Sequence, residues 1–139
     1  MGEGASAVIY PLAVWEPGPV EKTGYLGLAV NECRGVVCHS MVGSYAGAYG
    51  RLMSADRASW QFSVLKDGSV RQHYDTRAVA WHSGSRAWNG RLIGIEHEGG
   101  GLGNDSEPLT QEQLAASVAL VRWLSSGCGF SMVRNVGLF

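Results

Sequence analysis

The chain has 139 residues, of which 45% are hydrophobic and 17% charged, so it carries enough apolar side chains for a core and is not a disordered chain. We expect residues 1–139 to form a single domain, with residues 1–30 as an N-terminal arm. The 12 acidic and 11 basic residues give a net charge of -1 and form no basic stripe, so nucleic acid is not the expected partner. No apolar stretch approaches the roughly 20 residues that span a bilayer, and the N-terminus lacks the pattern of a signal peptide. We therefore expect a chain that is made in the cytoplasm, without a membrane span.

The first half of the chain predicts an arm, a strand and a helix. Residues 15–19 (WEPGP) predict an extended segment with a turn, and residues 25–30 a short edge strand. Residues 34–39 (RGVVCH) are apolar and β-branched, which predicts a buried strand that ends at His39. A glycine-rich loop follows this strand and includes one helical stretch, over residues 46–53.

The second half predicts a hairpin, another strand and a long helix. Residues 60–65 and 69–74 are two strands joined by Lys-Asp-Gly, a strong hairpin signal. A loop over residues 75–90 leads to a strand over residues 92–98. The helix over residues 110–124 begins with a capping box of Thr110 and Gln113 and ends at the glycines of positions 127 and 129. Helical spacing places four apolar residues on its buried face: Leu114, Val118, Val121 and Leu124.

Three cysteines, at positions 33, 38 and 128, have no regular spacing. An odd number without a pattern does not indicate a disulfide framework. We therefore expect buried, reduced thiols.

His39 and Glu96 are the strongest candidates for a catalytic role. His39 ends a strand just before a glycine-rich loop, where a neutral imidazole suits zinc; the alternative is a histidine that only hydrogen-bonds at the strand end. Glu96 alternates with Ile95 and His97, which places the carboxylate on the less apolar face, where it is able to act as a general base. The alternative is a strand whose face with Glu96 is exposed to water. The same alternation places His97 on the opposite face from Glu96.

His82 and Trp81 lie together on a loop. An imidazole beside a tryptophan is suited to lining a sugar or peptide groove, and the alternative is a loop histidine packed under the indole. His73 lies on a hairpin strand, and we assign it no role.

Five segments resemble, in the same order, motifs of the zinc-dependent N-acetylmuramoyl-L-alanine amidase family, which includes phage endolysins and peptidoglycan recognition proteins. The resemblance extends over about residues 34–126. Residues 36–40 (VVCHS) are similar to the family's strand with the first histidine ligand, and residues 58–62 (ASWQF) with 66–68 (KDG) are similar to its "S-x-H-F" strand and "D-G" turn. Residues 80–84 (AWHSG) are similar to "A-W-H-A-G", and residues 89–96 (NGRLIGIE) to "N-x-x-S-I-G-I-E". Residues 109–113 (LTQEQ) are similar to "L-T-x-x-Q" at the start of the following helix.

The resemblance implies an α/β fold with a central mixed β-sheet flanked by helices and a zinc ion in a groove. It implies that His39 is the first zinc ligand and that Glu96 is the base which activates water. That water attacks the amide between N-acetylmuramic acid and L-alanine. Trp81, His82 and Trp60 are then the expected substrate-binding residues. The partner is bacterial peptidoglycan, and we expect a monomer that acts on the cell wall in phage-encoded lysis.

This sequence departs from the family pattern at three places. Gln61 replaces the histidine of "S-x-H-F", and Trp60 stands where some members have tyrosine. The family takes its second histidine and a Cys or Asp ligand from a "G-H … P-G" segment after the helix, which this sequence lacks, and Cys128 comes too early to serve. Three interpretations remain: a peptidoglycan amidase whose sequence is truncated here or whose missing ligands come from another chain, an inactive peptidoglycan-binding module of the same fold, and an inactive remnant that regulates a partner.

Overall fold

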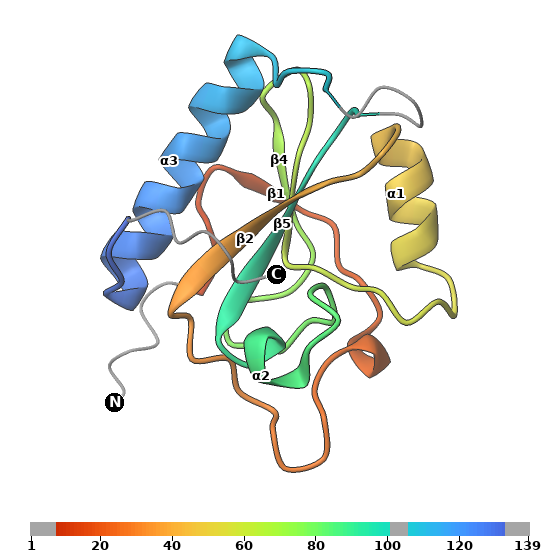
Figure 1. The fold of residues 1–139 in the computed structure, drawn as a ribbon, viewed down its shortest axis with the longest axis vertical. Helices are drawn as coiled ribbons and strands as arrows, with labels where there is room; N and C mark the ends of the chain where they lie inside the picture. Colours follow the sequence, from red (N-terminus) through yellow and green to blue (C-terminus); the bar gives the residue numbers. More distant parts are fainter. Residues whose placement is uncertain (1–7, 101–105, 133–139) are drawn as a thin grey trace.

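A computed structural model describes residues 8–100 and 106–132, which form a five-stranded sheet with helices on both faces (Figure 1). The strand order is β1-β4-β3-β5-β2. Only β3 and β4 are antiparallel, and the other neighbouring strands run parallel, so the sheet is mixed, as expected. The elements are β1 (Ala13–Trp15), the 3-10 helix η2 (Val20–Lys22), β2 (Gly35–Ser40), α1 (Tyr45–Leu52), β3 (Phe62–Val64), β4 (Val70–Gln72), α2 (Arg86–Asn89), β5 (Leu92–His97) and α3 (Gln111–Cys128).

The two faces of the sheet are covered by different helices (Figure 1). Side chains of β3 and β5, among them Phe62 and Ile95, pack against Leu120 and Leu124 of α3 in the larger core cluster. On the other face, α1 contributes Leu52 to a smaller cluster with Trp60 and Tyr74. None of the described helices is both long and apolar enough to cross a membrane.

Helix α3 begins as the sequence predicts, but the face that it presents to the sheet is only partly the predicted one. Thr110 and Gln113 form the expected capping box, and the helix ends before Gly129, which has a φ of 83°. Its buried positions are 113, 117, 120 and 124, whereas Leu114 is 53% exposed. Leu124 is buried and Val121 packs against the core, as expected, whereas Leu114 is replaced on the inner face by Gln113. The Nε2 of Gln113 finds partners there, because it donates to the carbonyls of Val64, at 3.1 Å, and Glu98, at 2.9 Å.

Three further local expectations need correction. Residues 25–30 form no edge strand; a tight turn closes there through the main-chain bonds between Tyr25 and Leu28. The strand that ends near His39 is itself the sheet edge, so β2 is half-exposed rather than buried. The loop over residues 75–90 contains the short helix α2, which Ser85 caps.

The cysteines are not all reduced, which corrects the expectation of free buried thiols. Cys33 and Cys128 form a disulfide across a sequence separation of 95, and Cys38 is free and exposed. The disulfide joins the segment before β2 to the last residue of α3. It therefore ties α3 to the edge of the sheet that carries His39.

A buried lysine holds the end of α1 beside the N-terminal arm. The Nζ of Lys22 donates to three main-chain carbonyls, those of Arg51 (3.2 Å), Leu52 (2.8 Å) and Ser54 (3.2 Å). These carbonyls lie at the negative end of the helix dipole, where a cation is favourable. Lys22 thus satisfies helix-end groups and fixes α1 over the sheet.

Candidate active site

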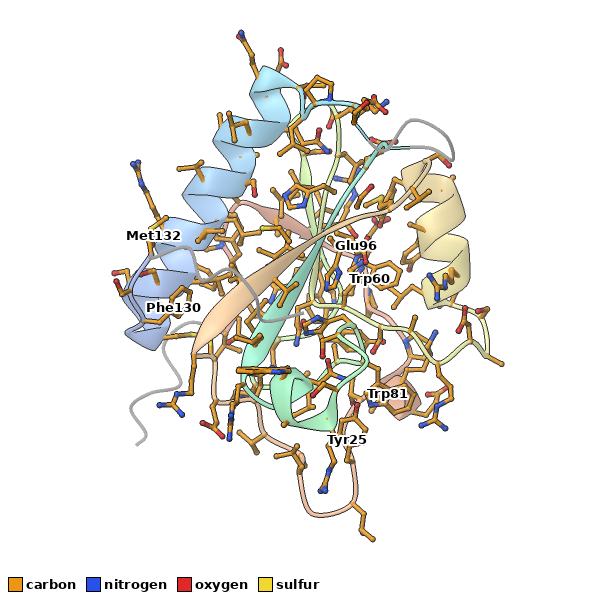
Figure 2. All side chains as sticks on the ribbon, viewed as in Figure 1. Tyr25, Trp60, Trp81, Glu96, Phe130 and Met132 are labelled. Atoms are coloured by element: carbon orange, nitrogen blue, oxygen red, sulfur yellow. A yellow bond between two sulfur atoms is a disulfide. The ribbon has the colours of Figure 1, made fainter. Side chains whose placement is uncertain are left out.

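Glu96 and His39 lie side by side on the two strands at one edge of the sheet, β5 and β2, on the face that α1 partly covers. Strand pairing aligns five residues in one row across the sheet, and neighbours in register point to the same face: Val14, Arg71, Ser63, Glu96 and His39. Figure 2 shows the Glu96 side chain on the side of β5 toward α1. The sequence-predicted pair is therefore brought together by the parallel pairing of β2 with β5.

His97 points to the other face, as the alternation predicts. Its Nδ1 donates to the carbonyl of His39 at 3.2 Å, and its Nε2 accepts from the hydroxyl of Ser117 on α3 at 2.8 Å. His97 therefore has a structural role between the sheet and α3, away from the Glu96 carboxylate.

The Glu96 carboxyl is poised to exchange protons near neutral pH. Burial raises its pKa to about 7, and the positive charge of Arg51 on α1 offsets this only in part. Burial has this effect because a charged carboxylate loses hydration in a low-dielectric site. A base whose pKa lies near the working pH is well suited to take a proton from water and return it.

His82 forms a pair with His39. The Nε2 of His39 lies 3.1 Å from the Nδ1 of His82, and the ring centroids are 5.2 Å apart. The Nε2 of His82 faces the carbonyl of Leu92 at 3.4 Å, so we assign the His82 proton to Nε2. His39 then donates its Nε2–H to the Nδ1 of His82.

Three polar or small residues that the sequence analysis did not single out for this role hold His82 in place. A Cβ on Gly94 would lie 2.6 Å from Cγ of His82, so the imidazole packs directly on the backbone of β5. The Asn89 side chain accepts from the backbone nitrogens of His82 (3.3 Å) and Ser83 (2.9 Å). Gln61, which replaces the family histidine, accepts from Gly94 N at 2.8 Å and donates to the carbonyl of Ala78 at 2.9 Å. Gln61 therefore links the loop before His82 to β5.

Both imidazoles of the pair are neutral at pH 7. Burial, with the nearby His97 as a smaller cause, lowers the pKa of His39. Burial, with the charge of His39 second, lowers the pKa of His82 to about 4. A neutral imidazole is the form that binds metal ions.

The described residues do not complete a zinc site. Both ring nitrogens of His82 are engaged, one with His39 and one with the Leu92 carbonyl. Residues 8–100 and 106–132 contain no group of three or more His, Cys, Asp or Glu side chains placed to hold a metal. Catalytic zinc usually has three protein ligands. The donor set among these residues therefore does not fit a complete zinc centre. The sequence analysis expects no Gly-His ligand segment after the helix. The positions after residue 132 lie outside the described residues, so the structure does not test this expectation.

A second serine–histidine contact lies in the same row but is not arranged for nucleophilic attack. His73 donates from Nδ1 to the carbonyl of Glu16 at 2.7 Å and accepts at Nε2 from the Ser63 hydroxyl at 2.8 Å. The same hydroxyl accepts from Nε1 of Trp60 at 2.9 Å. Ser63 is fully buried, so this network holds β3, β4 and the arm together rather than meeting a substrate.

The two tryptophans of the predicted groove differ in position. Trp60 is only 3% exposed and packs with Leu52 and Tyr74, so little of its ring is open to a ligand, and its role in substrate binding stays a prediction. Trp81 is half-buried; its Nε1 donates to Gly24 O at 3.0 Å, and its ring lines a surface pocket.

Two cavities lie near the site. The larger, about 340 Å³, lies between the ends of β2 and β5 and the start of α3; His97 and Ser117 line it, and Glu96 does not. The smaller, about 180 Å³, is lined by Tyr25, Arg57, Trp81, Gly84 and Asn89. Because Asn89 also bonds His82, the smaller cavity adjoins the histidine pair.

Comparisons with known proteins agree with this fold. A model of the N-acetylmuramoyl-L-alanine amidase family matches residues 29–136. N-acetylmuramoyl-L-alanine amidase A of Achromobacter lyticus is 32% identical over 95 residues, which make up 67% of this chain and 51% of that protein. The solved catalytic domain of XlyA is similar with a TM-score of 0.65 at 23% identity, covering 86% of this chain and 78% of that chain. The endolysin amidase LysCS from Clostridium intestinale URNW has a TM-score of 0.61 at 20% identity, covering 88% of this chain and 78% of that chain.

The mixed sheet that pairs His39 with Glu96 in this chain thus has the same fold as the solved amidase structures. Because the family model matches most of its residues, the chain belongs to the N-acetylmuramoyl-L-alanine amidase family. The chain spans about half the length of the Achromobacter relative.

Proposed function

We propose that the chain is a peptidoglycan hydrolase that cleaves the amide between N-acetylmuramic acid and L-alanine. The observation that carries the proposal is the Glu96 carboxyl, whose pKa burial raises to about 7, in register with His39 on the covered face of the sheet. Membership of the amidase family supports the choice of bond.

Glu96 supplies the proton transfers in this proposal. Its carboxylate accepts a proton from water as the water oxygen attacks the lactyl carbonyl carbon. When the carbon–nitrogen bond breaks, the Glu96 carboxylic acid returns the proton to the alanine nitrogen. The products are a lactyl carboxylate and a free amino end. General-base help of this kind is typically worth ~10²–10⁴-fold in rate.

His39 is proposed as a zinc ligand on the family resemblance. Zinc, when bound, would polarise the carbonyl and lower the pKa of water. The donors among the described residues leave that site incomplete, so zinc dependence stays a proposal and the proton steps above are assigned to Glu96 alone. His82 positions His39 through the 3.1 Å contact.

A role in cell-wall lysis is part of the proposal, because one structural neighbour is a clostridial endolysin amidase. The alternative function is an inactive peptidoglycan-binding module of the same fold. The hydrogen bond that His39 Nε2 makes with His82 Nδ1, in a site without three ligand side chains among the described residues, is the observation that favours this alternative.

Purified cell walls test the proposal. We expect the chain, supplied with zinc, to release free amino groups from L-alanine without releasing reducing sugars. Glu96→Gln should lower the rate by ~10²–10⁴-fold, because glutamine keeps the size of the side chain but does not accept the proton. Reducing sugars without amino groups would mean that the enzyme is a glycosidase. Tight binding to walls without any product would favour the binding module.

A further inference from the structure

Asn31 is a buried polar residue in the segment that leads into β2, and only 6% of its surface is exposed. Its side-chain Nδ2 faces three main-chain carbonyls, those of Leu92 at 2.8 Å, Ala78 at 3.1 Å and Asn89 at 3.2 Å. Its Oδ1 accepts from the backbone nitrogen of Cys33 at 2.7 Å. These neighbours fix the orientation of the amide, because a carbonyl only accepts a hydrogen bond and a backbone N–H only donates one.

On one side, the Asn31 amide fixes the turn from which the strand with His39 starts. Cys33 has a φ of 49°, in the left-handed region that residues with a side chain rarely adopt. The bond from the Cys33 nitrogen to Oδ1 of Asn31 closes this turn, since asparagine commonly binds the backbone two residues further on. Strand β2 begins two residues later, at Gly35, and its register with β5 places His39 beside Glu96.

On the other side, the same amide holds the two groups that contact His82. The Leu92 carbonyl, which Nε2 of His82 faces at 3.4 Å, also accepts the shorter bond from Asn31. Asn89 accepts from Asn31 at its main-chain oxygen, and its side-chain oxygen accepts from the backbone nitrogen of His82 at 3.3 Å. Asn31 therefore acts on His82 through two contacts, one at the ring and one at the backbone.

We propose that Asn31 is a positioning residue that holds His82 in one tautomer and thereby orients the ring of His39. The inference rests on the proposed function, because that function gives His39 and Glu96 their task. With the Leu92 carbonyl held in place, His82 keeps its proton on Nε2, since a carbonyl offers no hydrogen. Nδ1 of His82 then accepts from Nε2 of His39 at 3.1 Å, and this leaves the lone pair of His39 on its Nδ1.

Loss of the Asn31 amide should release the His82 ring. The Leu92 carbonyl would lose its shorter bond and with it a fixed direction, so Nε2 of His82 would have no constant acceptor. The neutral imidazole would then populate both tautomers. In the second tautomer a hydrogen on Nδ1 of His82 faces the hydrogen on Nε2 of His39, so the 3.1 Å contact is lost and His39 turns away.

NMR spectra of the full chain, labelled with ¹⁵N at its four histidines, test the proposal. Long-range couplings show which ring nitrogen carries the proton, and the spectra are recorded at neutral pH with a chelator, so that no metal decides the tautomer. We expect His82 of the parent chain to be protonated only at Nε2. Asn31→Ala should show a mixture of the two tautomers, together with shifted ring signals of His39.

Gln72→Ala is the matched control, because it removes a fully buried amide with a comparable set of main-chain partners. Oε1 of Gln72 accepts from the nitrogen of Tyr10 at 2.8 Å, and its Nε2 donates to the carbonyls of Val8 (2.9 Å) and Tyr74 (3.0 Å). None of these partners contacts the histidine pair. Gln72→Ala should therefore destabilise the fold and leave the tautomer of His82 as in the parent chain.

Hydrolysis of purified walls supplies a second readout. Asn31→Ala should lower the maximal rate by ~10-fold, an effect of the size that residues orienting the side chains of a site typically have. The wall concentration at half the maximal rate should change by less than ~2-fold, because a buried residue that meets no substrate affects the chemical step rather than binding. Asn31→Ser, whose hydroxyl keeps one donor, is the milder variant if Asn31→Ala does not fold, and it should show the same changes in smaller degree.

A single His82 tautomer in the folded Asn31 variant, identical to that of the parent chain, would overturn the proposal. The same mixture of tautomers in Gln72→Ala would also overturn it, since any loss of stability would then release the ring. These results are separate from the proposed function. A parent chain that hydrolyses walls, with an unchanged His82 in the variant, would keep the amidase and remove the positioning role. A tautomer change in a chain without hydrolysis would keep the positioning role and remove the amidase.

Discussion

Replacing Glu96 with glutamine should make the protein more stable at alkaline pH. Burial raises the pKa of the Glu96 carboxyl from an ordinary value of 4.5 to about 7, so the folded chain holds this proton more tightly than the unfolded chain. The stability that comes from this group is complete below the unfolded pKa, and it is lost as the pH rises toward the folded pKa. Above about pH 7 the wild-type chain carries an ionised, poorly hydrated carboxylate, which opposes folding.

The size of the effect follows from the two pKa values. A difference from 4.5 to about 7, at ~1.36 kcal/mol for each pKa unit, sets an upper value of ~3 kcal/mol. The side chain is partly exposed, and solvent screens its charge. We therefore expect the difference in unfolding free energy between Glu96→Gln and the parent chain to rise, in favour of the variant, by ~1–2 kcal/mol from about pH 5 to about pH 8. Removing a functional charge commonly stabilises a fold in this way.

Denaturant unfolding of the parent chain and of Glu96→Gln at both pH values measures the difference directly. Glu21→Gln is the matched control, because Glu21 is exposed and its loss should change stability little at either pH. A gain in Glu96→Gln that is the same at both pH values, or a loss at the higher pH, would refute the desolvation argument. An equal gain would mean that ionisation of Glu96 does not affect stability, and a loss at the higher pH would mean that a cation balances the carboxylate in the folded chain.

Three other changes follow from the contacts. Lys22→Met should lower the unfolding free energy by ~1–3 kcal/mol, because the carbonyls at the end of α1 lose their donor; urea unfolding checks this, and an unchanged midpoint would contradict it. Cys33→Ser should cost ~3–5 kcal/mol, since the bond to Cys128 closes a loop across a separation of 95; equal stability under oxidising and reducing conditions would contradict it. Gly94→Ala should displace His82, because the new Cβ would lie 2.6 Å from its ring; unchanged His82 ring signals in NMR spectra would show that the site relaxes instead.

Local patterns in the sequence predicted the parts of the fold and site that depend on them. Period-two alternation placed Glu96 opposite His97, and the structure pairs Glu96 in register with His39. The Asp-Gly turn and the capping box of Thr110 are likewise properties of a few consecutive residues, and both elements occur as predicted.

Contacts between distant segments were not predictable in this way. The disulfide joins Cys33 and Cys128, and no spacing rule brings two such positions together. The buried face of α3 was predicted only in part, because Gln113 is polar yet finds main-chain partners in β3 and after β5.

The contact between His39 and His82 also depends on distant segments. Gln61 and Asn89 hold the loop over β5 with side-chain bonds, and neither carries a local signal for that role. The resemblance of residues 80–84 to a family motif indicated that this loop is functional, but it did not show that His82 contacts His39.

Mass spectrometry of the products from one soluble substrate tests the central claim most directly. The chain, supplied with zinc, is incubated with N-acetylmuramoyl-L-alanyl-D-glutamate in water enriched in ¹⁸O. The account predicts free N-acetylmuramic acid with one ¹⁸O in its lactyl carboxylate, together with unlabelled L-alanyl-D-glutamate, and almost none of either with Glu96→Gln. Cleavage at another bond, or an unchanged rate in Glu96→Gln, would contradict it.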